Sequence, residues 1–243
     1  KTRIMKDEKL QNYLQESLYA PVNRKRFLKY TAMGGAGLML GLGACHKDHG
    51  SGPASGTIDV GAGDPGILNF AYALEQLEAA FYIKVNASFY TNATTEEKAI
   101  LTDIMNHEIT HRDFLKKALA GGAIADLKFD FSSVDFTSRA SVLGTAKALE
   151  DTGVSAYNGA GQYIRNPDYL VVAGKIVSVE ARHAAAIRDL LNPKSADFAG
   201  DDVVATDTGL DFSRTPNSTT GGPSIVATAN TFLSTKISAN QLP

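Results

Sequence analysis

The sequence predicts an all-α protein: an antiparallel four-helix bundle with a long crossover between its second and third helices, plus a short C-terminal helix. Between residues 66 and 192, apolar residues recur with the spacing of amphipathic helices in four successive segments. The first and third links between these segments are short, whereas residues 121–137 are long enough to cross the bundle. Each segment also carries a glutamate at the same level of its apolar seam. These observations together predict a bundle with polar groups at mid-height in its core.

The composition restricts the class of function. The 243 residues are 44% hydrophobic, which is enough for a substantial core, and a formal net charge of -2 argues against nucleic acid as a partner. The single cysteine excludes an internal disulfide framework and any cysteine-rich zinc or iron–sulfur site. A metal site in this chain must therefore use carboxylates and imidazoles.

The N-terminal part of the chain changes character twice. Residues 1–22 form a polar, charged extension. Residues 23–45 contain the parts of an export signal, namely a basic start, an apolar Gly-rich stretch and small residues before Cys45. The apolar stretch is too short for a standard membrane span.

Two resemblances refine this prediction. The basic start resembles the twin-arginine export box, with Lys25 in place of the second arginine, and residues 42–45 resemble a bacterial lipobox. They imply a lipoprotein that is exported already folded and cleaved before Cys45. It would reside in the periplasm or envelope, anchored to a membrane through a lipid on that cysteine. The alternative is a buried Gly-rich helix with an inert cysteine.

A predicted linker precedes the first two helices. Residues 46–65 are rich in Gly, Ser, Pro and Asp, which predicts a flexible tether. The first helix is predicted at 67–85, after an Asp-Pro pair that is typical of helix starts. The second, at 95–119, opens with a capping box from Thr94 to Glu97 and closes before a glycine pair.

The third and fourth helices are predicted at 138–163 and 167–191, and an Asn-Pro pair stops the last one. Within the crossover, residues 128–131 alternate like a strand but are expected to pack as an extended segment. The tail, residues 193–243, is polar and lacks the apolar mass for a second domain. Its one candidate helix, at 223–233, is expected to cap the bundle.

The four seams align in one heptad frame, and the polar residues within them repeat. Two helices carry a glutamate followed seven residues later by a tyrosine, and the other two carry a glutamate followed three residues later by a histidine. The two halves therefore look like copies of one hairpin related by a pseudo-twofold axis. The repeated pairs are Glu75 with Tyr82, Glu150 with Tyr157, Glu108 with His111, and Glu180 with His183.

Four buried carboxylates alone would repel one another and take up protons. Two imidazoles and two divalent cations would balance the charge and give every group a partner. The alternative is a metal-free polar core in which hydrogen-bonded carboxylates satisfy one another.

This set of residues resembles the ferritin-like di-iron carboxylate proteins, in which two helices each give one Glu and two others each give Glu-x-x-His. More narrowly, residues 74–82, 149–157 and 179–183 resemble the exported ferritin-like domain family that includes plant desiccation-related proteins. The resemblance covers the predicted bundle and implies a ferritin-like fold with a pair of iron ions.

The resemblance also implies a role for each repeated residue. One metal would be held by Glu75 with His111 and the other by Glu150 with His183, while Glu108 and Glu180 would bridge them. The implied cofactors are two Fe ions, alternatively Mn or mixed Fe/Mn, although zinc can bind such ligands too. Tyr82 and Tyr157 would orient the terminal carboxylates by hydrogen bonds. The implied catalytic residues are Glu108, Glu180, Tyr82 and Tyr157.

Other polar residues near the seam have less defined roles. Glu78 lies one turn past Glu75, where the third helix has Gly153, and is either an extra ligand, a proton relay or a structural residue. The glycine, together with the absence of a Cys-rich rubredoxin module, argues against a rubrerythrin-type peroxidase. His107, one position off the frame, is expected at the surface or boundary. Three arginines are expected to pair with acids on solvated faces, namely Arg112, Arg182 and Arg188.

The predicted function is oxidation of Fe(II) by O2 or peroxide in envelope stress protection. Its partners would be metal ions, O2 or peroxide, and a membrane reached through Cys45, with no role for nucleic acid. Two alternatives keep the fold without the chemistry: a non-catalytic envelope stress or structural protein, and an accessory subunit of a membrane assembly. The sequence leaves open whether the partner is a second copy of the chain or a membrane complex.

Overall fold

The computed structural model describes residues 56–200, 216–217 and 223–242. The predicted N-terminal extension, the signal-like segment at 23–45 and the lipidation site Cys45 lie outside the described residues. Within the described part of the chain, no helix combines the length and the apolar character needed to cross a membrane.

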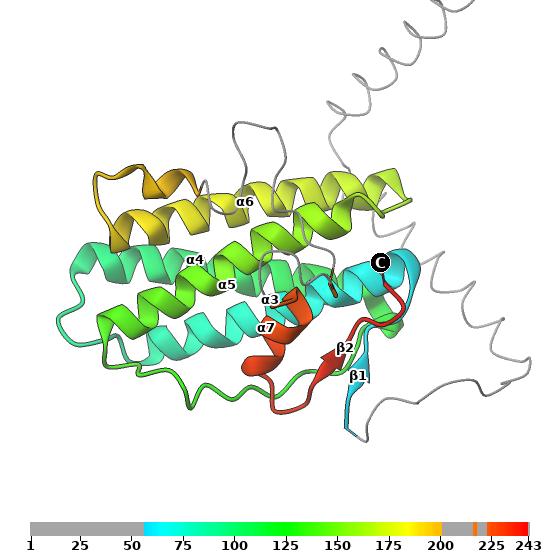
Figure 1. The fold of residues 1–243 in the computed structure, drawn as a ribbon, viewed down its shortest axis with the longest axis horizontal. Coiled ribbons are helices and arrows are strands. Elements are labelled where there is room, and N and C mark those ends of the chain that lie inside the picture. Colours follow the sequence, from blue (N-terminus) through cyan, green and yellow to red (C-terminus); the bar gives the residue numbers. More distant parts are fainter. Residues whose placement is uncertain (1–55, 201–215, 218–222, 243) are drawn as a thin grey trace, which may run out of the picture.

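Four long helices form the bundle (Figure 1): α3 (Gly63–Ala87), α4 (Thr95–Leu119), α5 (Arg139–Gly161) and α6 (Pro167–Leu191). Helix α3 packs mainly against α4, and α5 mainly against α6, so two helical hairpins lie against each other. The predicted bundle with a long second link is therefore confirmed.

The helix starts follow the local chemistry of the sequence. At the start of α4, the Thr94 hydroxyl accepts a hydrogen bond from the Glu97 amide at 3.1 Å, and the Glu97 carboxylate accepts one from the Thr94 amide at 2.8 Å. This is the predicted capping box. Helix α6 has Pro at its first position, and the Asn166 side chain caps it by accepting from the Asp168 amide at 2.9 Å.

Short elements complete the described chain: β1 (Ile58–Asp59), the 3-10 helices η1 (Ala120–Gly122) and η2 (Ala196–Ala199), α7 (Ile225–Thr231) and β2 (Ile237–Ser238). The crossover residue Phe129 forms an antiparallel bridge with Leu233, and the Asp130 amide donates to the Phe232 carbonyl at 2.8 Å. Helix α7 packs on α5 beside this crossover, midway along the bundle, rather than over its end as expected (Figure 1). The alternating segment at 128–131 is thus an extended crossover bound to the tail.

The end of the predicted linker also differs from expectation. Residues 58–59 form β1, which pairs in parallel with β2, with Ile58 opposite Ile237. Helix α3 then begins at Gly63, four residues before the predicted start. Gly66, in the first turn of α3, has no room for a side chain, because a Cβ there would lie 2.5 Å from the carbonyl oxygen of Gly61. Close packing of this segment explains why it does not behave as a tether.

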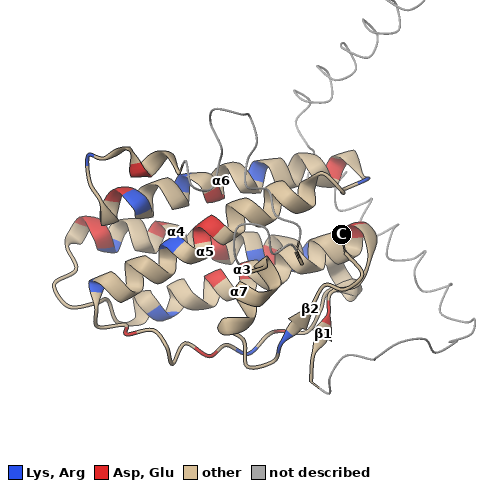
Figure 2. Cartoon of the chain, in the orientation of Figure 1, with Lys and Arg blue, Asp and Glu red and all other residues tan. Residues whose placement is uncertain are grey.

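Helix α3 is the most deeply embedded element. Every residue from 66 to 79 is buried, because α4, α5, the crossover and the tail cover it on all sides. Its buried amides hold the crossover in place: the Gln76 carbonyl accepts from the Leu127 amide at 2.8 Å, and the Asn69 carbonyl accepts from the Ile124 amide at 2.9 Å. Acidic and basic residues are interspersed along the outer turns, and further acidic positions lie midway along the bundle helices (Figure 2).

Candidate metal centre

Four glutamates meet in the middle of the bundle, one from each long helix. All four side chains are fully buried, with a relative exposure of 0%, and each lies between apolar seam residues of its own helix. Such burial of ionisable groups is rare without a compensating partner. The four residues are Glu75, Glu108, Glu150 and Glu180.

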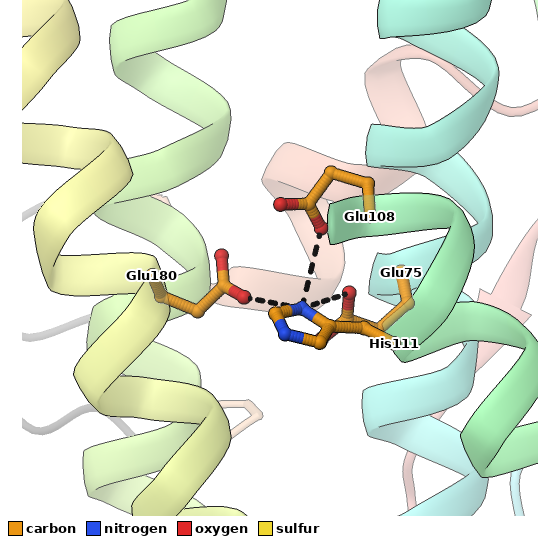
Figure 3. Close-up of side chains that lie close together, drawn as sticks. All are labelled: Glu75, Glu108, His111 and Glu180. Atoms are coloured by element: carbon orange, nitrogen blue, oxygen red, sulfur yellow. Dashed lines mark ion pairs between the residues drawn. The ribbon is translucent and has the colours of Figure 1, made fainter. Parts of the chain in front are cut away.

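One histidine lies among three of these carboxylates (Figure 3). The Nδ1 atom of His111 is 2.8 Å from Glu180 Oε1, 3.3 Å from Glu75 Oε2 and 3.7 Å from Glu108 Oε2. One ligand atom from each of these four residues lies within 4.8 Å of all the others. The four residues come from three different helices, so the fold alone brings them together.

The second histidine lies in a matching group. The Nδ1 atom of His183 is 2.8 Å from Glu108 Oε1, 3.5 Å from Glu150 Oε2 and 3.9 Å from Glu180 Oε2. The two groups share Glu108 and Glu180, and each of these turns one oxygen towards His111 and the other towards His183. The structure therefore brings together the six residues that the sequence nominated as ligands.

Two tyrosines support the terminal carboxylates from the opposite half of the bundle. The Tyr82 hydroxyl donates to Glu150 Oε1 at 2.6 Å, and the Tyr157 hydroxyl donates to Glu75 Oε1 at 2.5 Å. The tyrosine and glutamate that lie seven residues apart on one helix therefore do not bond to each other. The tyrosine of α3 bonds to the glutamate of α5, and the tyrosine of α5 bonds to the glutamate of α3. These bonds fix one oxygen of each terminal carboxylate and leave the other oxygen towards the histidines.

The remaining ligand atoms at the centre fit a pair of cations. These buried atoms have no hydrogen-bond partner within the described residues: Glu75 Oε2, Glu150 Oε2, both carboxylate oxygens of Glu108 and of Glu180, and Nδ1 of His111 and of His183. Nδ1 of each histidine lies 2.8 Å from a carboxylate oxygen, yet neither contact has the geometry of a hydrogen bond. Converging unpaired carboxylate and imidazole atoms are a donor set that suits Fe, Mn or Zn.

Protons compensate the charge when no cation is bound. Burial raises the pKa of Glu75 to about 8, helped by repulsion from Glu108, and burial and the same repulsion raise the pKa of Glu180 well above its usual range. For Glu108, burial acts upwards, but its contacts with His111 and His183 outweigh it and lower the pKa to about 2.

The two histidines show the opposite balance. Burial acts to lower their pKa values, but the surrounding carboxylates, Glu108 foremost, raise the pKa of His111 to about 12 and that of His183 to about 10. Both imidazoles are therefore cations at neutral pH in the metal-free protein. A metal ion that binds here must displace these protons.

Glu78 lies beside the site but belongs to neither ligand group within the described residues. It is 2% exposed, and its Oε2 atom has no hydrogen-bond partner there. A Cβ on Gly153 would lie 3.2 Å from Glu78 Oε1 and 3.5 Å from Glu180 Oε2, so the glycine leaves room for the two carboxylates. Burial, followed by repulsion from Glu180, raises the pKa of Glu78 well above its usual range.

His107 contacts the centre in a way that the sequence did not predict. It is exposed, as expected, but its Nδ1 atom lies 2.8 Å from Nε2 of His183, and the two rings stack with centroids 5.1 Å apart. Partial burial and the neighbouring His183 lower the pKa of His107, so its neutral ring can accept a hydrogen bond. The heptad frame contained no signal for this contact, because it does not show which off-seam residues meet across two helices.

The arginine predictions had mixed outcomes. Arg112 pairs with Asp113 at 2.8 Å on the surface, and the exposed Arg182 donates to the Ser178 carbonyl. Arg188 pairs with an acid, as predicted, but not on a solvated face: it is only 4% exposed and forms a two-pronged ion pair with Asp151, at 2.6 and 3.0 Å, between α6 and α5. Asp151 and Arg188 each directly follow a seam residue, and the seam alone does not reveal that these two off-seam positions meet between the helices.

Comparison with known proteins agrees with this geometry. No curated protein matches the chain. A family model described as a ferritin-like domain matches residues 63–193, which is more than half of the chain and spans all four bundle helices. The chain therefore belongs to the ferritin-like domain family.

Proposed function

We propose that the protein is a di-metal carboxylate protein that binds two iron ions, or manganese in one or both positions, and oxidises Fe(II) with O2 or peroxide. The observation that carries this proposal is the sharing of Glu108 and Glu180 between the two histidines. Two cations beside these histidines would be bridged by two carboxylates. Glu75 with His111 would hold one ion, and Glu150 with His183 the other.

The residues around the centre would hold the metal ions, orient the ligands and keep a proton nearby. Iron bound by these residues would supply electrons as Fe(II) is oxidised to Fe(III), and two electrons with two protons would convert O2 to hydrogen peroxide or hydrogen peroxide to two waters. Tyr82 and Tyr157 keep one oxygen of each terminal carboxylate occupied, so that the other oxygen faces the centre. Glu78, buried beside Glu180, would hold a proton near the centre or serve as an additional ligand.

The proposed setting is the cell envelope, where the protein would protect against oxidative stress. This part rests on the export signal-like segment and on Cys45, which lie outside the described residues. If Cys45 carries a lipid, the full-length protein should fractionate with membranes and Cys45→Ser should not. Equal fractionation of the two proteins would remove the anchor from the proposal.

Metal analysis combined with Fe(II) oxidation tests the central claim. Wild-type protein should retain about two transition-metal ions per chain and oxidise Fe(II) faster than buffer. Glu108→Gln and His111→Ala should each lower both the metal content and the rate, because each removes a ligand atom from the shared centre. Glu96→Gln is the matched control, since this exposed glutamate lies in the first turn of the same helix, far from the centre.

The outcomes separate the competing functions. Wild-type protein that holds no transition metal and oxidises iron at the background rate would overturn the proposal. Bound metal without Fe(II) oxidation by O2 or by peroxide would leave a metal-stabilised protein with a structural or accessory role.

A further inference from the structure

The two histidines at the centre differ on the side that faces away from the carboxylates. His183 uses its outer nitrogen, Nε2, for the 2.8 Å contact with His107 Nδ1, and the two rings stack at an interplanar angle of 18°. The outer nitrogen of His111 has no hydrogen-bond partner in the described part of the chain. The His111 side chain is also more exposed, at 12% against 6% for His183.

The two halves of the sequence also differ at the position that makes this contact. The two hairpins repeat so that Glu108 and His111 correspond to Glu180 and His183. His107 comes directly before Glu108, and the matching residue, directly before Glu180, is Val179. Valine cannot hydrogen-bond an imidazole, so only one half of the pseudo-symmetric site has this support.

We propose that His107 is a positioning residue that makes the two metal positions unequal, with the position formed by Glu150 and His183 the tighter of the two. The inference rests on the metal centre proposed above and adds an order of loading to it. The position formed by Glu75 and His111 is then filled second and emptied first.

The physical reason lies in the tautomer of His183. A ligand nitrogen must be free of its proton, so when Nδ1 faces a cation the ring proton resides on Nε2. That proton is then donated to Nδ1 of His107, whose own ring proton resides on its other nitrogen. A fixed tautomer, a fixed ring orientation and a more basic ligand follow, and loss of such a partner typically costs about 10–100-fold in metal affinity.

His107 is not itself well placed as a third ligand. Its inner nitrogen is occupied by His183, and it belongs to neither group of converging ligand atoms within the described residues. Its effect on the centre must therefore act through His183.

Binding of Co2+, a redox-stable probe, tests this inference by calorimetry and by the visible absorption of the bound ion. The wild-type protein should bind two Co2+ ions with affinities that differ by about 10–100-fold. His107→Val, which copies Val179, should weaken the tighter ion by a similar factor. His107→Gln should restore most of the affinity, because its amide oxygen can accept the same hydrogen bond.

Two background variants locate the effect. In His111→Ala, the intact position is the one formed by Glu150 and His183, and adding His107→Val should weaken Co2+ binding there. In His183→Ala, adding His107→Val should leave the remaining affinity unchanged. Unfolding midpoints of all variants control for loss of structure, which an exposed position such as 107 should tolerate.

Several results would overturn the inference. The first is equal affinity of the wild-type protein for its two Co2+ ions. The second is a His107→Val variant that binds the tighter ion as strongly as the wild type. The third is an equal effect of His107→Val on Co2+ affinity in the His111→Ala and His183→Ala backgrounds. Each of these leaves the proposed metal centre standing. Absence of Co2+ and other transition-metal binding from the wild type would instead remove the metal centre and this inference together.

Discussion

At the scale of single residues, the centre is stabilised by side chains that reach across from the other half of the bundle. Within the described residues, each terminal carboxylate accepts a hydrogen bond from one tyrosine hydroxyl: Glu150 from Tyr82 and Glu75 from Tyr157. The sequence predicted that the two tyrosines orient the terminal carboxylates, but it did not show that the partner of each tyrosine lies on the other hairpin. Sequence spacing shows which residues share a face; it does not show which residues meet across the core.

Removal of one tyrosine hydroxyl should destabilise the metal-free protein. Tyr82→Phe leaves an oxygen of the fully buried Glu150 without its donor, and Tyr157→Phe does the same to Glu75. Each change should cost about 1–3 kcal/mol in the free energy of unfolding, measured by urea denaturation. Tyr163→Phe, at an exposed position, should change it by less than about 0.5 kcal/mol. A cost in Tyr82→Phe no larger than in this control would contradict the role of its hydroxyl.

At the scale of elements, the helices were the most predictable part of the chain. The capping box at Thr94, the glycine pair after α4 and the Asn-Pro pair after α6 are local signals, and the observed bounds agree with them closely. The strands β1 and β2 were missed because two residues contain no readable alternation. The early start of α3 was missed because its first residues are held by packing on Gly61 rather than by helix-forming side chains.

The ion pair between α5 and α6 gives a prediction for this scale. Arg188→Leu removes both bonds to Asp151 and should lower the free energy of unfolding by about 2 kcal/mol. The cost should stay below that of a fully buried pair, because the Asp151 side chain is 18% exposed. Arg182→Leu, one and a half turns earlier on the exposed face, serves as the control and should cost less than about 0.5 kcal/mol. Similar urea midpoints for both variants would show that the pair does not stabilise the packing of α5 on α6.

At the scale of the whole molecule, the architecture was predictable and the position of the tail was not. Four in-register seams and one long link suffice to predict a bundle with a crossover, and the repeated glutamates predict where its centre lies. The tail joins the fold through main-chain bonds, such as that from the Ser234 amide to the Lys128 carbonyl, and such bonds depend weakly on side-chain identity. The tail also buries a few spaced apolar side chains in the core, among them Ile225, Leu233 and Ile237, and their spacing follows no helix or strand period that the sequence could reveal.

Stability of the metal-free protein should depend on pH through the buried carboxylates and imidazoles of the centre. The raised pKa of Glu75, about 8, gives stability that is complete below the unfolded value of 4.5 and is lost as the pH rises to about 8. The raised pKa of His183, about 10, likewise gives stability that is complete below 6.5 and is lost as the pH rises to about 10. Glu108 acts in reverse, because its lowered pKa of about 2 gives stability that is lost as the pH falls from 4.5.

The melting temperature of metal-free protein should therefore fall as the pH rises from about 5 to about 9. Saturating Zn2+ or Mn2+ should reduce or reverse this fall, because metal binding displaces protons and strengthens with pH. Glu75→Gln should show a shallower fall without metal, since its side chain does not titrate. A melting temperature of the metal-free protein that rises across this range would contradict the assigned proton positions.

The exchange of tyrosines between hairpins has a consequence for how such a protein can arise and be rebuilt. One hairpin, α3 with α4, contains a terminal glutamate, a shared glutamate, a histidine and a tyrosine, yet its tyrosine reaches only the glutamate of another hairpin. Two copies of such a hairpin, related by a twofold axis, would supply every group of the centre. A designed homodimer of helical hairpins should therefore be able to form the same centre, whereas a single chain with two hairpins lets the two copies differ, as they do at His107 and Val179.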